Sequence, residues 1–222
     1  MKPILSRVTP LRHALRLLAC TAGSLAPLAG QAADPVSLAQ FIAIERAAPT
    51  LQLAYGAAPS QQIDVFIPAG QGPHPVAVLI HGGCWSAATA GREQLRHLGA
   101  ELARDGIAVW SIGYRRANEA GGGYPGTYLD VADGIDTLRT HATRHGLDLA
   151  RSVLVGHSAG GHLALWAAAR GGLERGSALY RAAPYTPHTT IALAGIGDLA
   201  AFRPQIPVIC GDGIAEPLLG PA

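Results

Sequence analysis

The sequence has little charge, no internal repeat and no low-complexity tract after residue 33. Lys and Arg number 17 and Asp and Glu number 15, so charged residues make up only 14% of the 222 residues. Hydrophobic residues make up 49%, which excludes an intrinsically disordered chain and is typical of a globular α/β domain with a core. No domain boundary is visible, and we expect one domain over residues 34–222.

The N-terminal segment lacks an apolar run long enough to span a membrane. The run from Leu17 to Ala29 falls short of the roughly 20 residues that a spanning helix needs. Basic residues precede this run, and the small-residue stretch Gly30–Ala33 follows it. This order is typical of a secretory signal peptide over residues 1–33, cleaved near Ala32 or Ala33, and predicts a periplasmic or secreted protein without a stable membrane anchor. The basic residues are Lys2, Arg7, Arg12 and Arg16.

The mature chain also lacks an excess of basic residues. Residues 1–33 contain four Lys or Arg and no acidic residue, which leaves 13 basic and 15 acidic side chains in the remainder. The net charge of +2 therefore comes from the predicted leader. Nucleic-acid-binding surfaces depend on clustered Lys and Arg, so the sequence predicts no nucleic-acid partner.

Cysteine is scarce: the chain has three, and only Cys84 and Cys210 follow the predicted leader. In an oxidising compartment these two could form a disulfide, and two unpaired buried thiols are at least as good an interpretation. Neither cysteine stands at metal-ligand spacing from a histidine. We expect no metal and no cofactor.

What the sequence does contain is a regular alternation of strands and helices. Ile63, Val65 and Ile67 alternate with polar residues and predict a half-buried strand. Val76–Ile80 is apolar throughout, which indicates a strand covered on both faces. The order predicts a doubly wound α/β fold with a mostly parallel sheet flanked by helices. The other expected strands are 107–112, 152–155 and 190–194, and the expected helices are 91–104, 127–145 and 159–170.

The helix expected over 127–145 has its own start and stop signals. Thr127-Tyr-Leu-Asp130 has the form of a capping box, and Gly146 is expected to end the helix. Apolar residues at helical spacing predict its buried face. They are Tyr128, Val131, Ile135 and Leu138.

The segment Gly156-His-Ser-Ala-Gly160 fits the pattern G-x-S-x-G and lies between an expected strand and an expected helix. In a nucleophile elbow, this sharp turn exposes the serine hydroxyl, and the helix N-terminus favours developing negative charge. The pattern alone also arises by chance, and Ser158 could then be only a small residue in a crowded turn. The position of the pattern between a strand and a helix is what supports a functional interpretation. We therefore interpret Ser158 as a candidate catalytic nucleophile.

A second segment, His81-Gly-Gly-Cys-Trp85, directly follows the buried strand Val76–Ile80. Acyl transfer passes through an oxyanion, and consecutive glycines let backbone N–H groups approach that oxygen. The residue after the nucleophile contributes a further N–H. We expect an oxyanion hole at Gly82, Gly83 and Ala159, and a glycine turn that merely ends a strand is the alternative.

Together these segments resemble the α/β-hydrolase superfamily, in particular the esterase/lipase branch with kynurenine-formamidase-like and feruloyl-esterase-like enzymes. Trp110–Arg115 and Tyr124–Asp130 resemble the strand and the helix entry between them, so the resemblance covers about residues 60–200. It implies an α/β-hydrolase fold, a nucleophile at Ser158, an oxyanion hole at the positions named above and a structural role for His81.

The sequence lacks a credible base for Ser158. The serine needs a histidine oriented by a carboxylate, and in α/β-hydrolases these follow in the order Ser, Asp or Glu, His. After Ser158 the histidines are His162, on the same expected helix, and His188, and none follows Asp198. We expect a C-terminally truncated domain that lacks the last strands, with its triad Asp and His beyond residue 222. A short family member with a rearranged triad is the alternative.

The leading hypothesis is a secreted serine hydrolase that cleaves carboxylic esters or small amides through an acyl-Ser158 intermediate. A non-catalytic fragment without the triad Asp and His is one alternative, and a serine exopeptidase on the same fold is another. Trp85 and Tyr124 are candidates for lining the site of such a small substrate, and core packing explains both equally well. The oligomeric state stays open.

Overall fold

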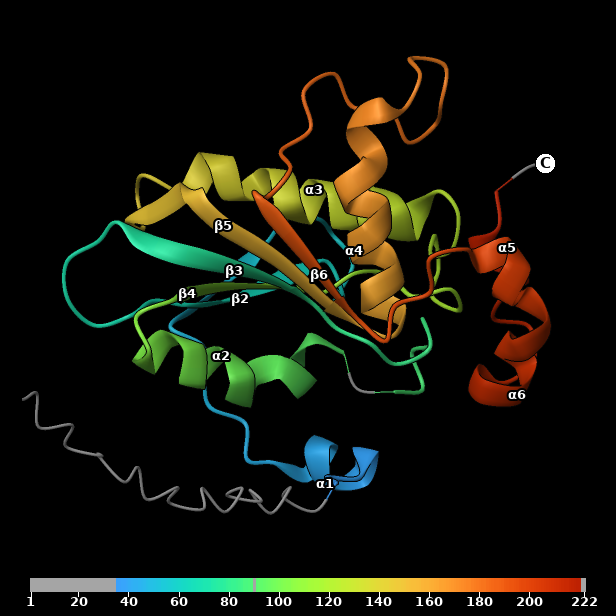
Figure 1. Ribbon diagram of the computed structural model, residues 1–222, viewed down its shortest axis with the longest axis horizontal. Coiled ribbons are helices and arrows are strands. Elements are labelled where there is room, and N and C mark those ends of the chain that lie inside the picture. Colours follow the sequence, from blue (N-terminus) through green and yellow to red (C-terminus); the bar gives the residue numbers. More distant parts are fainter. Residues whose placement is uncertain (1–34, 90, 221–222) are drawn as a thin grey trace, which may run out of the picture. The chain divides into compact units, whose positions relative to one another are not determined.

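The computed structural model describes residues 35–89 and 91–220 (Figure 1). The predicted signal peptide, residues 1–33, and its cleavage site lie outside the described residues. Within the described ranges, no helix is both long enough and apolar enough to cross a membrane.

In the described part of the chain, six strands form one mostly parallel sheet: β1 (Leu51–Ala54), β2 (Gln62–Phe66), β3 (His74–Ile80), β4 (Ala108–Ile112), β5 (Leu147–His157) and β6 (Thr189–Leu193). Their order across the sheet is β1-β2-β4-β3-β5-β6. β3, β4, β5 and β6 run parallel, whereas β2 pairs antiparallel with β1 and with β4. Ile80 lies in register with Ile112 and Gly156, so three parallel strands end together at one edge of the sheet.

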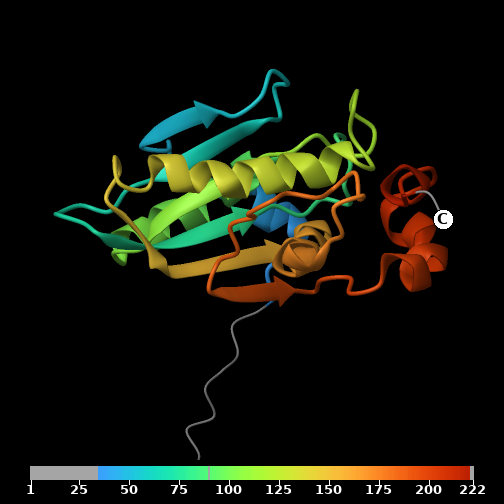
Figure 2. The ribbon, with the colours of Figure 1, turned by 90° about the horizontal axis from the view of Figure 1, so that it is seen from above.

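Helices cover both faces of the sheet. They are α1 (Leu38–Ala43), α2 (Arg96–Arg104), α3 (Gly126–His141), α4 (Ala159–Ala169), α5 (Leu199–Phe202) and α6 (Ile206–Cys210), with 3-10 turns η1 (Arg92–Leu95), η2 (Arg170–Gly172), η3 (Arg203–Gln205) and η4 (Glu216–Leu218). α3 and α4 lie on one face and α2 on the other (Figure 1). The segment with α5 and α6, red in Figure 2, lies beyond the carboxyl ends of the parallel strands. This arrangement confirms the predicted doubly wound α/β fold.

Apolar side chains fill the space on both sides of the parallel strands. On the α3 face, Trp110 and Ile135 are completely buried, and the Trp110 indole N–H donates to the Gly134 carbonyl at 2.9 Å. On the α2 face, Leu79 and Leu95 belong to a second buried cluster. Because successive side chains of a strand point to opposite faces, two covered faces require strands that are apolar throughout. The prediction for Val76–Ile80 is thereby confirmed.

The prediction that β2 is only half-buried is wrong, because its polar residue is buried as well. Asp64 is 0% exposed and accepts hydrogen bonds from Arg96 Nε (2.6 Å), Gln52 Nε2 (2.6 Å) and Arg92 Nε (3.1 Å). Burial acts to raise the pKa of Asp64, but these hydrogen bonds and the two arginine charges outweigh it and hold the pKa below its usual value. A buried carboxylate is tolerated only with such partners.

The predicted capping box at the start of α3 is also wrong. α3 begins at Gly126 without a side-chain cap. Thr127 Oγ1 instead donates to the Arg115 carbonyl (2.5 Å) and accepts from the Gly123 N–H (2.9 Å). Asp130 accepts from the backbone and the guanidinium of Arg115, so both polar residues tie α3 to the loop after β4. The predicted inner face is confirmed, since Tyr128, Val131, Ile135 and Leu138 are buried.

Candidate active site

The turn between β5 and α4 places Ser158 at the carboxyl edge of the sheet. β5 ends at His157 and α4 starts at Ala159, so Ser158 alone makes the turn. Its φ of 54° and ψ of −119° lie where a residue with a side chain is rarely found. This is the backbone geometry that a nucleophile elbow requires.

The turn is tight because the chain packs against itself there. A Cβ on Gly156 would lie 2.0 Å from the Gly160 carbonyl oxygen, and a Cβ on Gly160 would lie 2.1 Å from the Ile80 carbonyl oxygen. The Ser158 N–H donates to the Leu193 carbonyl at the end of β6 at 2.8 Å. The first turn of α4 is therefore held against the ends of three neighbouring strands.

The loop His81–Trp85 lies against this turn. A Cβ on Gly82 would lie 2.8 Å from the His157 carbonyl oxygen and 3.4 Å from Ser158 Cβ. The two segments that carry the expected chemistry, far apart in the sequence, therefore meet in space. The loop turns sharply, since its last three residues all have positive φ. The values are 103° for Gly83, 54° for Cys84 and 48° for Trp85.

Unpaired backbone donors gather where the loop and the turn meet. Among the described residues, no acceptor takes the N–H group of Gly83 or of Ala159. Ser158 stands at the N-cap of α4 without a side-chain hydrogen bond to the helix. N–H groups at a helix N-terminus stabilise a nearby negative charge. Gly82 and Ala159 therefore lie beside Ser158, and Gly83 directly follows Gly82 in the loop. Such an arrangement is suited to an oxyanion.

Hydrogen bonds and burial hold the loop in its strained form. The Gly83 carbonyl accepts from the Ser86 N–H (3.0 Å) and from Thr89 Oγ1 (2.8 Å), and the Trp85 carbonyl accepts from the Ala117 N–H (2.7 Å). The side chain of Trp85 is buried. Positive-φ residues with side chains cost about 1–3 kcal/mol each and persist only where the surroundings hold them.

His81 supports the loop from the protein interior. It is 1% exposed, and its ring stacks on Tyr114 with centroids 4.3 Å apart. His81 Nδ1 lies 2.8 Å from the Gly82 carbonyl oxygen, and the Tyr114 hydroxyl donates to the His81 carbonyl at 2.9 Å. Burial lowers the pKa of His81 to about 4, so the ring is uncharged at neutral pH. Sequence reasoning missed Tyr114, because only the stacking shows its part in the site.

A disulfide joins this loop to α6. Cys84 and Cys210 are bonded, with their Cα atoms 5.3 Å apart. The sequence left two interpretations open, and the structure decides for the paired cysteines. Because Cys84 directly follows Gly83, the bond anchors the candidate oxyanion loop covalently.

Aromatic rings pack together behind the turn. Trp85 is 1% exposed and meets the His162 ring edge-on at 5.5 Å, and Tyr128 meets the same ring at 5.8 Å. Trp85 therefore lies in the core, as the packing interpretation expects. Tyr124 is partly buried and packs beside Tyr128, with ring centroids 6.1 Å apart.

No histidine ring accompanies the hydroxyl of Ser158 among the described residues. His162 is held in the aromatic contacts, its Nδ1 has no partner, and burial lowers its pKa to about 4. His157 is exposed, and His188 precedes β6 at the opposite end of that strand. Asp198 does not orient a histidine, because its side chain caps α5 by accepting the Ala201 N–H. Within residues 35–89 and 91–220, no histidine ring is hydrogen-bonded to Asp or Glu, and no group of three or more metal-ligating side chains occurs.

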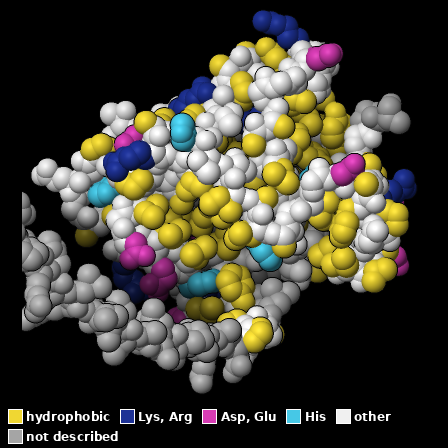
Figure 3. Space-filling model, in the orientation of Figure 1, with side chains coloured by type: hydrophobic (Ala, Val, Ile, Leu, Met, Phe, Trp, Pro, Cys, Tyr) yellow, Lys and Arg dark blue, Asp and Glu magenta, His cyan; other side chains and the backbone are white. Residues whose placement is uncertain are grey.

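An apolar hollow of about 430 Å³ lies beside the loop, on the α2 face of the sheet. Leu95, Leu98 and Leu193 line it, and Gly82 and His157 form its side toward the candidate site. Apolar side chains gather over β5 and β6 on this side of the molecule (Figure 3). The hollow therefore offers apolar surface next to the candidate oxyanion donors.

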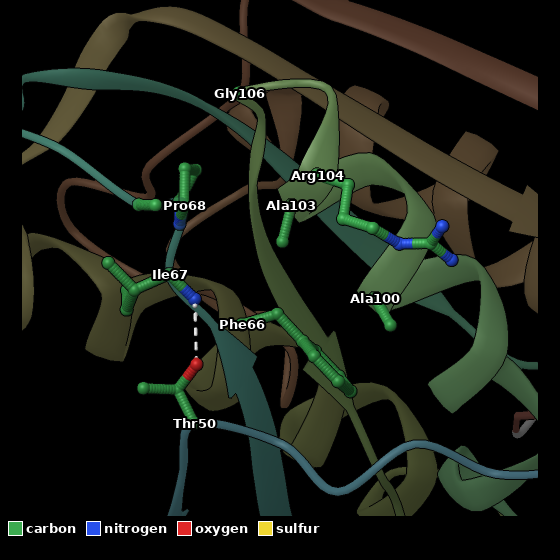
Figure 4. Close-up of a pocket in the computed structure, with 9 residues that line it drawn as sticks. Thr50, Phe66, Ile67, Pro68, Ala100, Ala103, Arg104 and Gly106 are labelled. Atoms are coloured by element: carbon green, nitrogen blue, oxygen red, sulfur yellow. Dashed lines mark hydrogen bonds between the residues drawn. The ribbon is translucent and has the colours of Figure 1, made fainter.

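Another hollow, of about 400 Å³, lies at the opposite edge of the sheet (Figure 4). Phe66 lines it and pairs with Val109 near the start of β4, so it is at the amino ends of the parallel strands. Thr50 Oγ1 there accepts the Ile67 N–H at 3.0 Å, and no histidine or carboxylate belongs to the lining. This hollow has no groups for acyl transfer.

Comparison with known families matches residues 63–207 to the BD-FAE family, which is more than half of the chain. Among curated proteins, the chain is similar to probable isoprenylcysteine alpha-carbonyl methylesterases. Those of Arabidopsis thaliana and Oryza sativa subsp. japonica are 33% and 35% identical over 113 residues. The match covers 50% of this chain and 23% and 26% of these relatives, so the chain spans about a quarter of their length.

Among solved structures, the chain is similar to a bifunctional GH43-CE protein of Bacteroides eggerthii, with a TM-score of 0.54 and 25% identity over 65% of this chain and 21% of that one. A truncated form of a carbohydrate esterase from gut microbiota gives a TM-score of 0.57 and 24% identity over 69% of this chain and 59% of that one. The second likeness concerns the fold alone.

Proposed function

Because the chain belongs to the BD-FAE family, an esterase-type α/β-hydrolase family, we propose that it cleaves small carboxylic esters through an acyl-Ser158 intermediate. The observation that carries the proposal is the close approach of Gly82 to Ser158, because the loop with the unpaired Gly83 N–H then lies next to the turn with the unpaired Ala159 N–H. Ser158 Oγ attacks the ester carbonyl carbon, and these N–H groups hold the oxyanion.

The collapse of the tetrahedral intermediate expels the alcohol and leaves the acyl group on Ser158 Oγ. Water then attacks the acyl-enzyme and releases the carboxylic acid. The serine proton must leave during acylation, and because no described histidine is placed to take it, the proton passes to solvent water. Oxyanion donors and binding alone still give about 10³–10⁴-fold acceleration over water. We therefore propose that the described residues support acylation by activated esters and that deacylation is slow without a base.

Esters are favoured over amides as substrates of this site. An alkoxide or phenolate leaves without prior protonation far more readily than an amine anion does. Proton delivery to the leaving group is the task of a general acid, and no described histidine is placed for it. The curated relatives are themselves named methylesterases, which also favours an ester as the substrate class. An exopeptidase would have to release an amine and is disfavoured on the same ground.

A second candidate function, a chain that binds esters without turning them over, is favoured by one observation. That observation is the absence of a hydrogen bond between a histidine ring and Ser158 among the described residues. The two candidates differ after the first acylation. An esterase releases product repeatedly, whereas a chain without a base releases at most one equivalent of alcohol.

The test is a burst experiment with 4-nitrophenyl acetate together with fluorophosphonate labelling. We expect a burst of one equivalent of nitrophenolate, a slow linear release after it, and labelling at Ser158. All three should be lost in Ser158→Ala and retained in the control Ser177→Ala, whereas a burst without any later release would favour the second candidate. Rapid linear turnover would show that the chain has its own base. Equal product release by the wild type and Ser158→Ala would contradict the acyl-serine proposal.

We also propose that residues 1–33 direct the protein to an oxidising compartment. The Cys84–Cys210 disulfide supports this, because such bonds persist in secreted and periplasmic proteins and are rare in the cytosol. Mass spectrometry of the protein recovered from the periplasm or the medium should find an N-terminus near residue 34. An uncleaved Met1 in the exported or cell-retained protein would contradict the proposal.

A further inference from the structure

The disulfide ties the candidate oxyanion loop to a segment with anchors of its own. Ile206, at the start of α6, is 0% exposed, and Leu218, beyond α6, is 1% exposed. The Tyr128 hydroxyl donates to the Leu218 carbonyl at 3.0 Å. Cys210 therefore lies in a segment held by core contacts on both sides. This segment lies beyond the carboxyl ends of the parallel strands (Figure 2). Ser158 directly follows the carboxyl end of one of them, β5.

Cys84 has no other anchor of this kind. Its neighbours are held by hydrogen bonds to the Gly83 and Trp85 carbonyls and by the burial of Trp85. By contrast, no described residue forms a hydrogen bond with the backbone N–H or carbonyl of Cys84. Cys84 nevertheless keeps a φ of 54°, a value that an L-residue holds only under restraint. Beside the hydrogen bonds of its two neighbours, the disulfide to Cys210 is the covalent tie that Cys84 itself makes.

We infer that the Cys84–Cys210 disulfide positions the oxyanion loop. It holds Cys84 in the left-handed conformation and thereby keeps the backbone of Gly82 and Gly83 against Ser158. The ability of Ser158 to become acylated then depends on the oxidised state of the disulfide. The part that concerns acylation rests on the proposed function, whereas the part that concerns the loop conformation does not.

Reduction of this disulfide is chemically simple and sterically open. Dithiothreitol transfers two electrons and two protons to the S–S bond, which yields two thiols, and is itself oxidised to its cyclic disulfide. Both cysteines are partly exposed, so the reductant reaches them in the folded protein. After reduction the Cys84 side chain no longer connects the loop to α6.

The experiment compares the folded protein before and after reduction by two readouts. Amide hydrogen exchange of a peptide over residues 81–89 should become at least about tenfold faster, while peptides from β3 and β5 keep their rates. Fluorophosphonate labelling of Ser158 should slow by about tenfold or more, since the loss of oxyanion donors costs up to 10²–10³. Reoxidation of the same sample should restore both readouts.

The double variant Cys84→Ser/Cys210→Ser is the matched control. It should behave like the reduced wild type and should not respond to dithiothreitol. Unchanged loop exchange and unchanged labelling after reduction would overturn the inference. Faster exchange throughout the sheet would also overturn it, because the disulfide would then support the whole fold.

The two proposals fail in different ways. If the oxidised protein shows no labelling that depends on Ser158, the proposed function fails. The exchange of the loop peptide then decides the inference alone: faster exchange on reduction supports it, and unchanged exchange overturns it.

Discussion

Gly82 lies against Ser158, so closely that a Cβ on the glycine would stand 3.4 Å from the Cβ of the serine. The reason is the order of the strands: β3 and β5 are parallel neighbours, with Ile80 beside Gly156 in register. Loops that leave neighbouring parallel strands emerge side by side at the carboxyl edge of the sheet. The sheet therefore brings a loop with free N–H groups to a strained serine.

Gly82→Ala is expected to slow the fluorophosphonate labelling of Ser158 by about 10²–10³-fold. The new Cβ would stand 2.8 Å from the His157 carbonyl oxygen, so the loop or the turn must move. Gly171→Ala is the matched control, because a Cβ there meets nothing within 4 Å. Circular dichroism checks that both variants fold. Labelling of Gly82→Ala at the wild-type rate would argue against the oxyanion assignment.

Gly160→Ala is expected to destabilise the fold by about 3 kcal/mol. Its Cβ would lie 2.1 Å from the Ile80 carbonyl oxygen and 2.5 Å from that of His81, which are backbone atoms that cannot rotate away. Urea unfolding measures the change. Gly197→Ala, where a Cβ has open space, should leave the midpoint unchanged. A Gly160→Ala protein with the wild-type midpoint would show that the turn has more room than the structure gives it.

Asp64→Asn is expected to lower the free energy of unfolding at pH 7 by about 3 kcal/mol, because Arg92 and Arg96 lose the charge that compensates them. The folded-state pKa of Asp64 lies below its usual value. Its contribution is therefore present above about pH 4 and is lost as the pH falls through the folded-state pKa. Urea unfolding at pH 7 and pH 3 should show a difference between wild type and variant that shrinks in acid. A constant difference would contradict this linkage.

His162→Phe is expected to make stability less dependent on pH between 7 and about 4.5. The pKa of His162 is lowered to about 4, so the unfolded chain binds a proton there that the folded chain does not, and stability falls as the pH drops. With about 1.4 kcal/mol per pKa unit, the residue accounts for roughly 3 kcal/mol of this fall. Phe keeps the ring contacts to Trp85 and Tyr128. Urea unfolding across this pH range measures how steeply the free energy of unfolding falls with pH in each protein. The fall should be shallower in His162→Phe than in the wild type.

The fold was predictable where a local pattern reflects burial directly. The apolar run Val76–Ile80 indicates a strand covered on both faces, and the structure has it as part of β3 in the middle of the sheet. The pattern misled at Asp64, since an alternating polar residue is the usual sign of a solvent-facing side. Its partners Arg92 and Arg96 come from a later turn and helix, and no local signal connects them to β2.

By itself, the sequence determined the parallel α/β architecture and a serine between glycines at a strand-to-helix turn, because burial patterns and turn residues act over a few neighbours. Only the tertiary structure decided that Gly82 lies close to Ser158, that Cys84 bonds Cys210, and that His162 packs against Trp85 and Tyr128. Each of these depends on which strands are neighbours and on distances between residues far apart in the chain, and a one-dimensional pattern contains neither.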